Sequence, residues 1–130
     1  MSTELIVLAW GCILGLVHIF AAANAKTKQY GPKWNMGPRD GVLPEPNPLV
    51  GRLMRAQANY FETFPLAAAA ILIVAVAGLT SRWTAIGAIV WLSARVVYLP
   101  LYAAGVPGLR SVVFLIGLAG MLTVLWPALF

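Results

Sequence analysis

Residues 5–25 read LIVLAWGCILGLVHIFAAANA, an apolar run with only isolated polar residues. A helix needs about 20 such residues to cross the hydrocarbon core of a bilayer. A cleaved signal sequence is the alternative, because residues 23–25 have the small-x-small form of a cleavage site. However, Glu4 rather than a basic residue precedes the run, the run is long, and Trp10 and His18 interrupt it. We therefore interpret it as a membrane-spanning helix.

The composition of the whole chain is that of a membrane protein. Of its 130 residues, 61% are hydrophobic and 10% are charged, whereas soluble domains are about 45–50% apolar and about 25% charged. So few charges cannot cover the surface of a small soluble domain, and apolar side chains must therefore face lipid. The length allows one domain, residues 1–130.

Three further apolar segments follow the first. We expect helices at residues 3–25, 49–79, 82–104 and 109–129, because backbone groups in lipid must be hydrogen bonded within their own segment. Residues 26–48 are rich in proline and glycine, which predicts a long connecting loop outside the lipid. The expected fold is an all-α integral membrane protein, a bundle of four transmembrane helices.

The basic residues predict how the chain is oriented in the membrane. Four of them, Lys26, Lys28, Lys33 and Arg39, lie in the first loop, whereas the second connection has only Arg82. The positive-inside rule then places the first and third connections in the cytoplasm and both termini on the opposite side. The same distribution argues against a nucleic-acid partner, because these residues border membrane segments and do not form a phosphate-binding face.

The sequence predicts no metal site. The single cysteine, Cys12, excludes an intrachain disulfide and a cysteine-based metal site, and it lies in an apolar run as a small packing or lipid-facing residue. His18 has no second ligand in sight, so we assign it to helix packing.

Polar side chains form two stripes within the apolar segments. The stripe in the second segment has i, i+4, i+7 spacing and consists of Arg55, Asn59 and Glu62. The stripe in the third segment has i, i+3, i+7 spacing and consists of Arg95, Tyr98 and Tyr102. A charge near the bilayer centre costs at least about 2.5–3.5 kcal/mol, so both stripes should face protein or a hydrated cavity. The predicted topology brings both stripes to the cytoplasmic side, together with Arg110.

Such a cavity suits a small zwitterionic or multiply charged ligand. Arginine binds carboxylates, Glu62 would accept an ammonium group, and the tyrosines would orient the ligand. The alternative is a purely structural role, in which Arg55 and Glu62 form ion pairs between helices or subunits and Arg95 pairs with Glu62 or a neighbouring helix end.

Residues 52–66, RLMRAQANYFETFPL, resemble the second-helix signature of the MAPEG superfamily, the membrane-associated proteins of eicosanoid and glutathione metabolism. Its members include microsomal glutathione transferases, leukotriene C synthase, microsomal prostaglandin E synthase and the lipoxygenase-activating protein. The motifs Ala94-Arg95-x-x-Tyr98-x-x-x-Tyr102 and Leu109-Arg110-Ser111 support the resemblance. The sequence departs from the pattern at Gly51, where an acidic residue is common, and at Thr63, where some members have tyrosine.

The resemblance implies a homotrimer that binds glutathione between neighbouring subunits near the cytoplasmic face. The glutathione-binding residues it implies are Arg52, Arg55, Asn59, Glu62, Arg95, Tyr98 and Tyr102, with Glu62 at the amino end of the tripeptide. It also implies that Arg110 is catalytic and lies beside the sulfur. An adjacent guanidinium favours the thiolate, which is the nucleophilic form of a thiol.

The leading functional hypothesis is a glutathione-dependent membrane transferase or peroxidase, whose lipophilic electrophile enters from the bilayer lipids. A second hypothesis is a non-catalytic lipid-binding or scaffold protein, because the lipoxygenase-activating protein has this fold without catalysis. A third is a small four-helix multidrug exporter, which needs a carboxylate deep in a span. Glu62 instead lies near one interface beside arginine and asparagine, which argues against the exporter.

Overall fold

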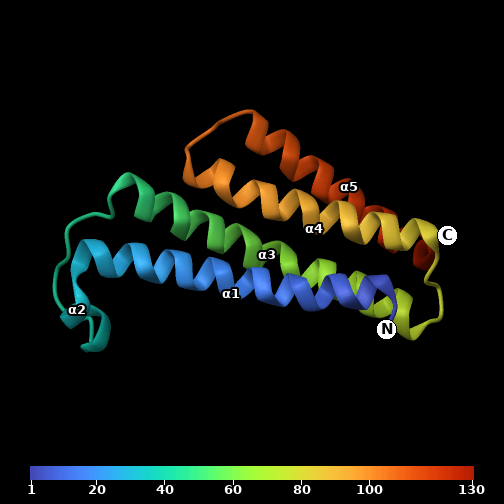
Figure 1. The fold of residues 1–130 in the computed structure, drawn as a ribbon, viewed down its shortest axis with the longest axis horizontal. Coiled ribbons are helices and arrows are strands. Elements are labelled where there is room, and N and C mark those ends of the chain that lie inside the picture. Colours follow the sequence, from blue (N-terminus) through green and yellow to red (C-terminus); the bar gives the residue numbers. More distant parts are fainter.

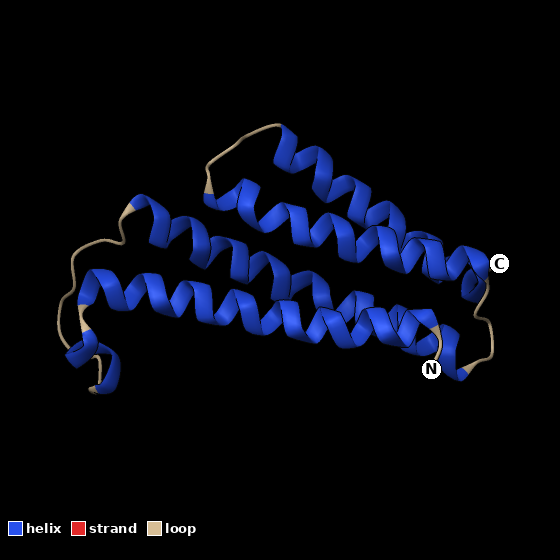
Figure 2. Cartoon of the chain, viewed as in Figure 1, coloured by secondary structure: helices blue, strands red, loops and turns tan.

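A computed structural model describes residues 1–130 of the chain. Four long helices, α1 (Thr3–Tyr30), α3 (Pro48–Val76), α4 (Arg82–Ala103) and α5 (Leu109–Leu129), are joined by short connections and by one longer segment that contains the short helix α2 (Pro32–Met36). Figure 2 shows that the rest of the chain is loop. Each long helix is long and apolar enough to cross a membrane. The predicted all-α fold with four candidate membrane spans is therefore confirmed.

The helices form two antiparallel pairs, as Figure 1 shows. Helix α1 packs along α3 and α4 packs along α5, while α1–α4, α3–α4 and α3–α5 contacts join the pairs. Both termini lie at one end of the bundle, and the α1–α3 and α4–α5 connections lie at the other (Figure 1). The first and third connections thus share one end, as predicted. Which membrane side this end faces stays a prediction.

Two helix ends differ from the predicted ones by more than one residue. Helix α1 continues beyond residue 25 to Tyr30. The apolar run indicates only how much of the helix lies in lipid, and no helix-breaking residue occurs between residue 25 and Gly31, whose φ is 97°. Helix α3 ends at Val76 rather than at residue 79, because Gly78 adopts a φ of 69°, the left-handed conformation that commonly follows a helix end.

The long connection folds back onto the end of α1. The Gln29 side chain donates to the carbonyl of Glu45 at 2.9 Å and accepts from the backbone N–H of Asn47 at 2.8 Å. The Tyr30 hydroxyl donates to the carbonyl of Pro44, also at 2.9 Å. These bonds fix where α3 begins relative to α1.

Glycines bring α4 and α5 into backbone contact. A Cβ atom added at Gly87 would lie 2.6 Å from the carbonyl oxygen of Gly120, and one added at Gly120 would lie 2.6 Å from the carbonyl oxygen of Gly87. Small residues are the usual means of close helix packing in membranes, where lipid removes the hydrophobic drive for association. The contact between these two glycines therefore sets how closely α4 and α5 approach.

An aromatic core centred on Tyr60 joins α1, α3 and α4. Tyr60 is fully buried, and its hydroxyl donates to the carbonyl of Gly11. Its ring stacks on His18, with centroids 4.7 Å apart, and on Phe64, with centroids 5.2 Å apart. Trp91 of α4 stacks on Phe64 at 5.9 Å. His18 thus has a packing position, in agreement with the role assigned from the sequence.

Candidate functional site

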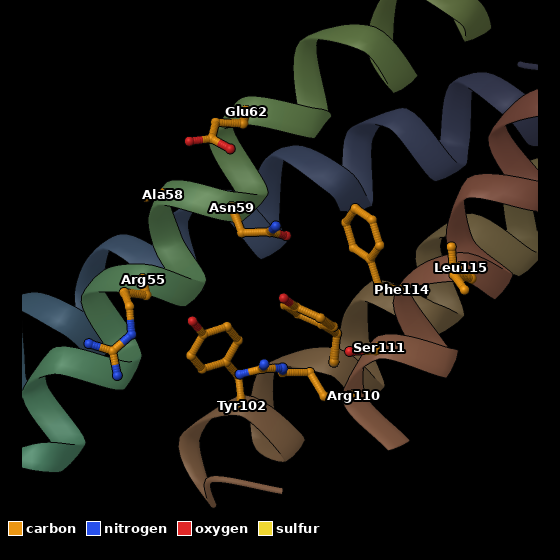
Figure 3. Close-up of a pocket in the computed structure, with 10 residues that line it drawn as sticks. Arg55, Ala58, Asn59, Glu62, Tyr102, Arg110, Ser111, Phe114 and Leu115 are labelled. Carbon is orange, nitrogen blue, oxygen red and sulfur yellow. The ribbon is translucent and has the colours of Figure 1, made fainter. Parts of the chain in front are cut away.

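A cavity of about 520 Å³ lies between α3, α4 and α5. Figure 3 shows the α3 side chains on one side of it and those of α4 and α5 on the other. The lining residues are Arg55, Ala58, Asn59, Glu62, Tyr98, Tyr102, Arg110, Ser111, Phe114 and Leu115. Six predicted site residues therefore meet in one cavity, at the bundle end that carries the first and third connections.

Helix α3 supplies the charged edge of the cavity. Helical periodicity places Arg55, Asn59 and Glu62 along one face, and all three line the cavity. Arg55 and Glu62 are exposed, whereas Asn59 is half-buried. The cavity is therefore open along α3, with a cation and an anion at its mouth.

Helices α4 and α5 supply an aromatic wall and a second cation. The Tyr98 ring is buried and lies edge-on to Tyr102, with centroids 5.6 Å apart. Phe114 of α5 lies 6.0 Å from Tyr98. The guanidinium carbon of Arg110, in the first turn of α5, lies 4.4 Å from the centre of the Tyr102 ring. Cations bind ring faces at such distances, so Tyr102 holds the Arg110 head group beside the cavity.

Two predicted site residues lie outside the cavity lining. Arg95 is only 2% exposed, and its Nη1 donates to Oδ1 of Asn59 at 2.7 Å. Its hydrogen bond therefore goes to the amide of Asn59 and not to Glu62, the partner considered in the structural alternative. Arg52 donates from Nη1 to the carbonyl of Ala103, the last residue of α4, at 3.4 Å. Arg52 thus links the beginning of α3 to the end of α4.

The electrostatics of the cavity favour an anionic or zwitterionic ligand. Arg55 and Arg110 bring two guanidinium groups to the lining, and Glu62 brings its one carboxylate. Guanidinium forks bind carboxylates in a bidentate fashion, and a carboxylate can accept from an ammonium group. The arrangement can hold a ligand that carries both kinds of charge.

The comparison with known proteins identifies the family of the chain. The sequence matches the model of the MAPEG family over residues 7–130, which includes every lining residue. The chain belongs to the MAPEG family. The resemblance found in residues 52–66 is thereby confirmed, and family membership indicates a membrane function related to glutathione or eicosanoids. No curated protein and no solved structure matches the chain.

Four lining residues of this MAPEG protein were not singled out as site residues from the sequence. They are Ala58, Ser111, Phe114 and Leu115. Phe114 lies four residues after Arg110, so it follows from helical periodicity once Arg110 is placed at the site. Leu115 lies four residues after Ser111 and follows only once Ser111 is placed there. Ala58 and Ser111 carry no charge that would single them out, and only the packing of the helices identifies them.

Proposed function

We propose that this MAPEG protein is a glutathione-dependent transferase or peroxidase that acts on a lipophilic electrophile from the membrane. The observation that carries the proposal is the meeting of Arg55, Glu62, Tyr102 and Arg110, from three helices, around one cavity. The proposal rests on the chemistry of these groups and on family membership.

The charge pattern along α3 fits an extended tripeptide. Arg55 and Glu62 are seven residues apart on one face, which corresponds to about 10 Å along a helix. Three extended residues span roughly 10 Å as well. Glutathione carries an ammonium and a carboxylate at one end and a second carboxylate at the other, so Glu62 would bind the ammonium and Arg55 a carboxylate. The hydroxyls of Tyr98 and Tyr102 would orient the tripeptide between them.

Arg110 would act on the sulfur. A guanidinium beside a thiol favours loss of its proton to water and stabilises the thiolate. In a transferase reaction, the thiolate sulfur bonds to an electrophilic carbon and the leaving group departs with its bonding electrons. In a peroxidase reaction, the sulfur attacks a peroxide oxygen, the O–O bond breaks, and the alkoxide leaves and takes a proton. The thiol of a second glutathione then attacks the sulfur of the resulting sulfenic acid, the S–O bond breaks, and the disulfide forms with release of water. The ring of Tyr102 would keep Arg110 in place through either reaction.

The proposal includes a homotrimer with the cavity open to the cytosol. Its support is the exposure of Arg55 and Glu62 in the single chain, because charges within a membrane are expected to face protein or water and not lipid. A neighbouring subunit over this face would provide such surroundings.

Purified protein in detergent tests the proposal. Glutathione titration should raise the ultraviolet absorbance of the thiolate, and a chlorinated nitrobenzene should be conjugated. Arg110→Gln should lower the conjugation rate by roughly 100-fold, the scale on which one electrostatic stabiliser acts. Arg82→Gln is the matched control, because Arg82 is exposed at the other end of the bundle and should leave the rate unchanged.

The outcomes separate enzyme from scaffold. No binding at millimolar glutathione would refute the proposal. Retained lipid binding, with Arg110→Gln equal to the wild type in every turnover assay, would favour a non-catalytic lipid-binding protein of the same fold.

A further inference from the structure

Arg95 is a buried cation behind the wall of the cavity. It is 2% exposed, and three aromatic rings surround its head group. The guanidinium carbon lies 4.3 Å from the centre of the Tyr98 ring, 5.4 Å from that of Tyr60 and 5.8 Å from that of Phe114. Tyr98 and Phe114 also line the cavity, so two of these rings lie both beside Arg95 and at the cavity. Arg95 itself does not line it.

The hydrogen bond from Arg95 determines which way the Asn59 amide points. A guanidinium can only donate, so the atom of Asn59 that faces it at 2.7 Å must be the carbonyl oxygen Oδ1. The reversed amide would set N–H against N–H in a dry interior. Asn59 also lines the cavity, and Figure 3 shows its amide on the inner side of α3. Because Oδ1 is turned toward Arg95, the group of the Asn59 amide that is left for a ligand is the Nδ2 donor.

The hydrogen bond from Arg95 to Asn59 should be stronger than a bond between two neutral groups. The Nε and Nη2 atoms of Arg95 are buried without a hydrogen-bond partner, so Asn59 provides the hydrogen-bond acceptor for this cation. Hydrogen bonds to charged groups are stronger than those between neutral groups, and low surrounding polarity strengthens them further. The surrounding rings also restrict where the guanidinium can move.

We propose that Arg95 is a positioning residue that holds the Asn59 carboxamide in one orientation. In that orientation, Asn59 presents its Nδ2 donor to the cavity. The cavity then selects ligand oxygen atoms, carboxylate or peptide carbonyl, at Asn59, and disfavours a ligand N–H there. This inference rests on the proposed function for the identity of the ligand. The fixed orientation of the Asn59 amide, however, is a property of the ligand-free protein.

Nuclear magnetic resonance of the ligand-free protein tests whether Arg95 fixes the orientation of the Asn59 amide. Asparagine is labelled with nitrogen-15, the Asn59 side-chain signal is assigned by its loss in Asn59→Ala, and Asn24, Asn35 and Asn47 serve as internal references. Arg95→Met replaces the guanidinium with an unbranched apolar side chain and so removes both the donor and the buried charge. Removing a buried charge in this way should not prevent folding. We expect it to shift the Asn59 signal alone, and Arg95→Lys, which restores a charged donor, to return the signal part of the way. An Asn59 signal unchanged in Arg95→Met would overturn the proposal.

Steady-state kinetics tests the consequence for the ligand. Arg95→Met should raise the KM for glutathione about tenfold, with little change in kcat, since an unlocked amide can turn its oxygen toward the ligand. In an Asn59→Ala background the same change should add nothing. Independent, multiplying effects of the two substitutions would mean that Arg95 acts on the ligand directly and would overturn the proposal. A lowered Tm with an unchanged KM would also overturn it, because the role of Arg95 would then be structural.

The two proposals can fail separately. If the wild-type protein does not bind glutathione, the proposed function is wrong, while the Asn59 signal of the ligand-free protein still decides whether Arg95 fixes the amide.

Discussion

The Arg110 guanidinium lies against the face of the Tyr102 ring, with 4.4 Å between the guanidinium carbon and the ring centre. Arg110 is the second residue of α5 and Tyr102 is near the end of α4, so the contact crosses the third connection. Tyr102 therefore has two separable roles. Its ring contacts the Arg110 guanidinium, and its hydroxyl belongs to a residue that lines the cavity.

Substitutions at Tyr102 should separate these two parts. Tyr102→Phe keeps the ring and should preserve thiolate formation by bound glutathione. Tyr102→Leu removes the ring face and should reduce thiolate formation about 2- to 30-fold, because a cation–ring contact contributes about 0.5–2 kcal/mol. The ultraviolet absorbance of the thiolate at saturating glutathione measures the difference. Equal losses in the two variants would mean that the hydroxyl, and not the ring, supports Arg110.

The backbone contact between α4 and α5 predicts a graded effect of added methyl groups. Gly120→Ala would place a Cβ 2.6 Å from the Gly87 carbonyl and 2.8 Å from the Trp91 nitrogen, both backbone atoms that cannot move alone. We expect a loss of about 1–3 kcal/mol in stability, as for other overpacked sites. Gly117→Ala is the matched control on the same helix, because its Cβ would lie 3.3 Å from the Ala94 Cβ, a contact that a small shift relieves.

Thermal unfolding in detergent measures both variants. Gly120→Ala should have the clearly lower Tm. If Gly117→Ala is equally destabilised, the contact between Gly87 and Gly120 does not set the spacing of the two helices.

The sequence predicted the α3 side of the cavity because helical periodicity alone aligns Arg55, Asn59 and Glu62. The up-and-down topology then brought this face to the same bundle end as Tyr102 and Arg110. Arg95 shows where such reasoning stops. Its spacing from Tyr98 places both on one stripe, but periodicity says nothing of depth, and only the packing of three aromatic rings places Arg95 behind the wall.

The first connection shows a second limit. Proline density predicted an extended loop, yet Pro32 stands at the first position of α2, where a missing N–H costs a helix nothing. The bonds from Gln29 and Tyr30 back to residues 44–47 depend on long-range contacts. Neither feature follows from local pattern.

A buried polar contact at the opposite end of the bundle should be important for stability. Glu4 is 2% exposed and accepts from the Thr84 hydroxyl at 2.5 Å. The same hydroxyl accepts from the N–H of Ser81 at 2.7 Å in the cap of α4. Thr84→Val removes both bonds and leaves a carboxylate without this partner, so we expect a loss of about 1–3 kcal/mol.

The control for this prediction is Thr123→Val, because the Thr123 hydroxyl donates only to the carbonyl of Ala119 in its own helix. Its Tm should stay close to that of the wild type, and glutathione binding should be unchanged in both variants. A Thr84→Val protein as stable as Thr123→Val would show that the link between α1 and α4 is dispensable.

Cysteine labelling in intact cells tests the predicted orientation. The basic residues of the first connection predict, by the positive-inside rule, that it lies in the cytosol, which would open the cavity toward the cytosolic glutathione pool. In a Cys12→Ser background, which removes the only native thiol, Asp40→Cys marks this connection and Thr80→Cys marks the α3–α4 connection; both positions are exposed. A membrane-impermeant maleimide should label Thr80→Cys in intact cells and Asp40→Cys only after permeabilisation. The reverse pattern would place the cavity on the other side, where a cytosolic thiol substrate could not reach it without crossing the membrane.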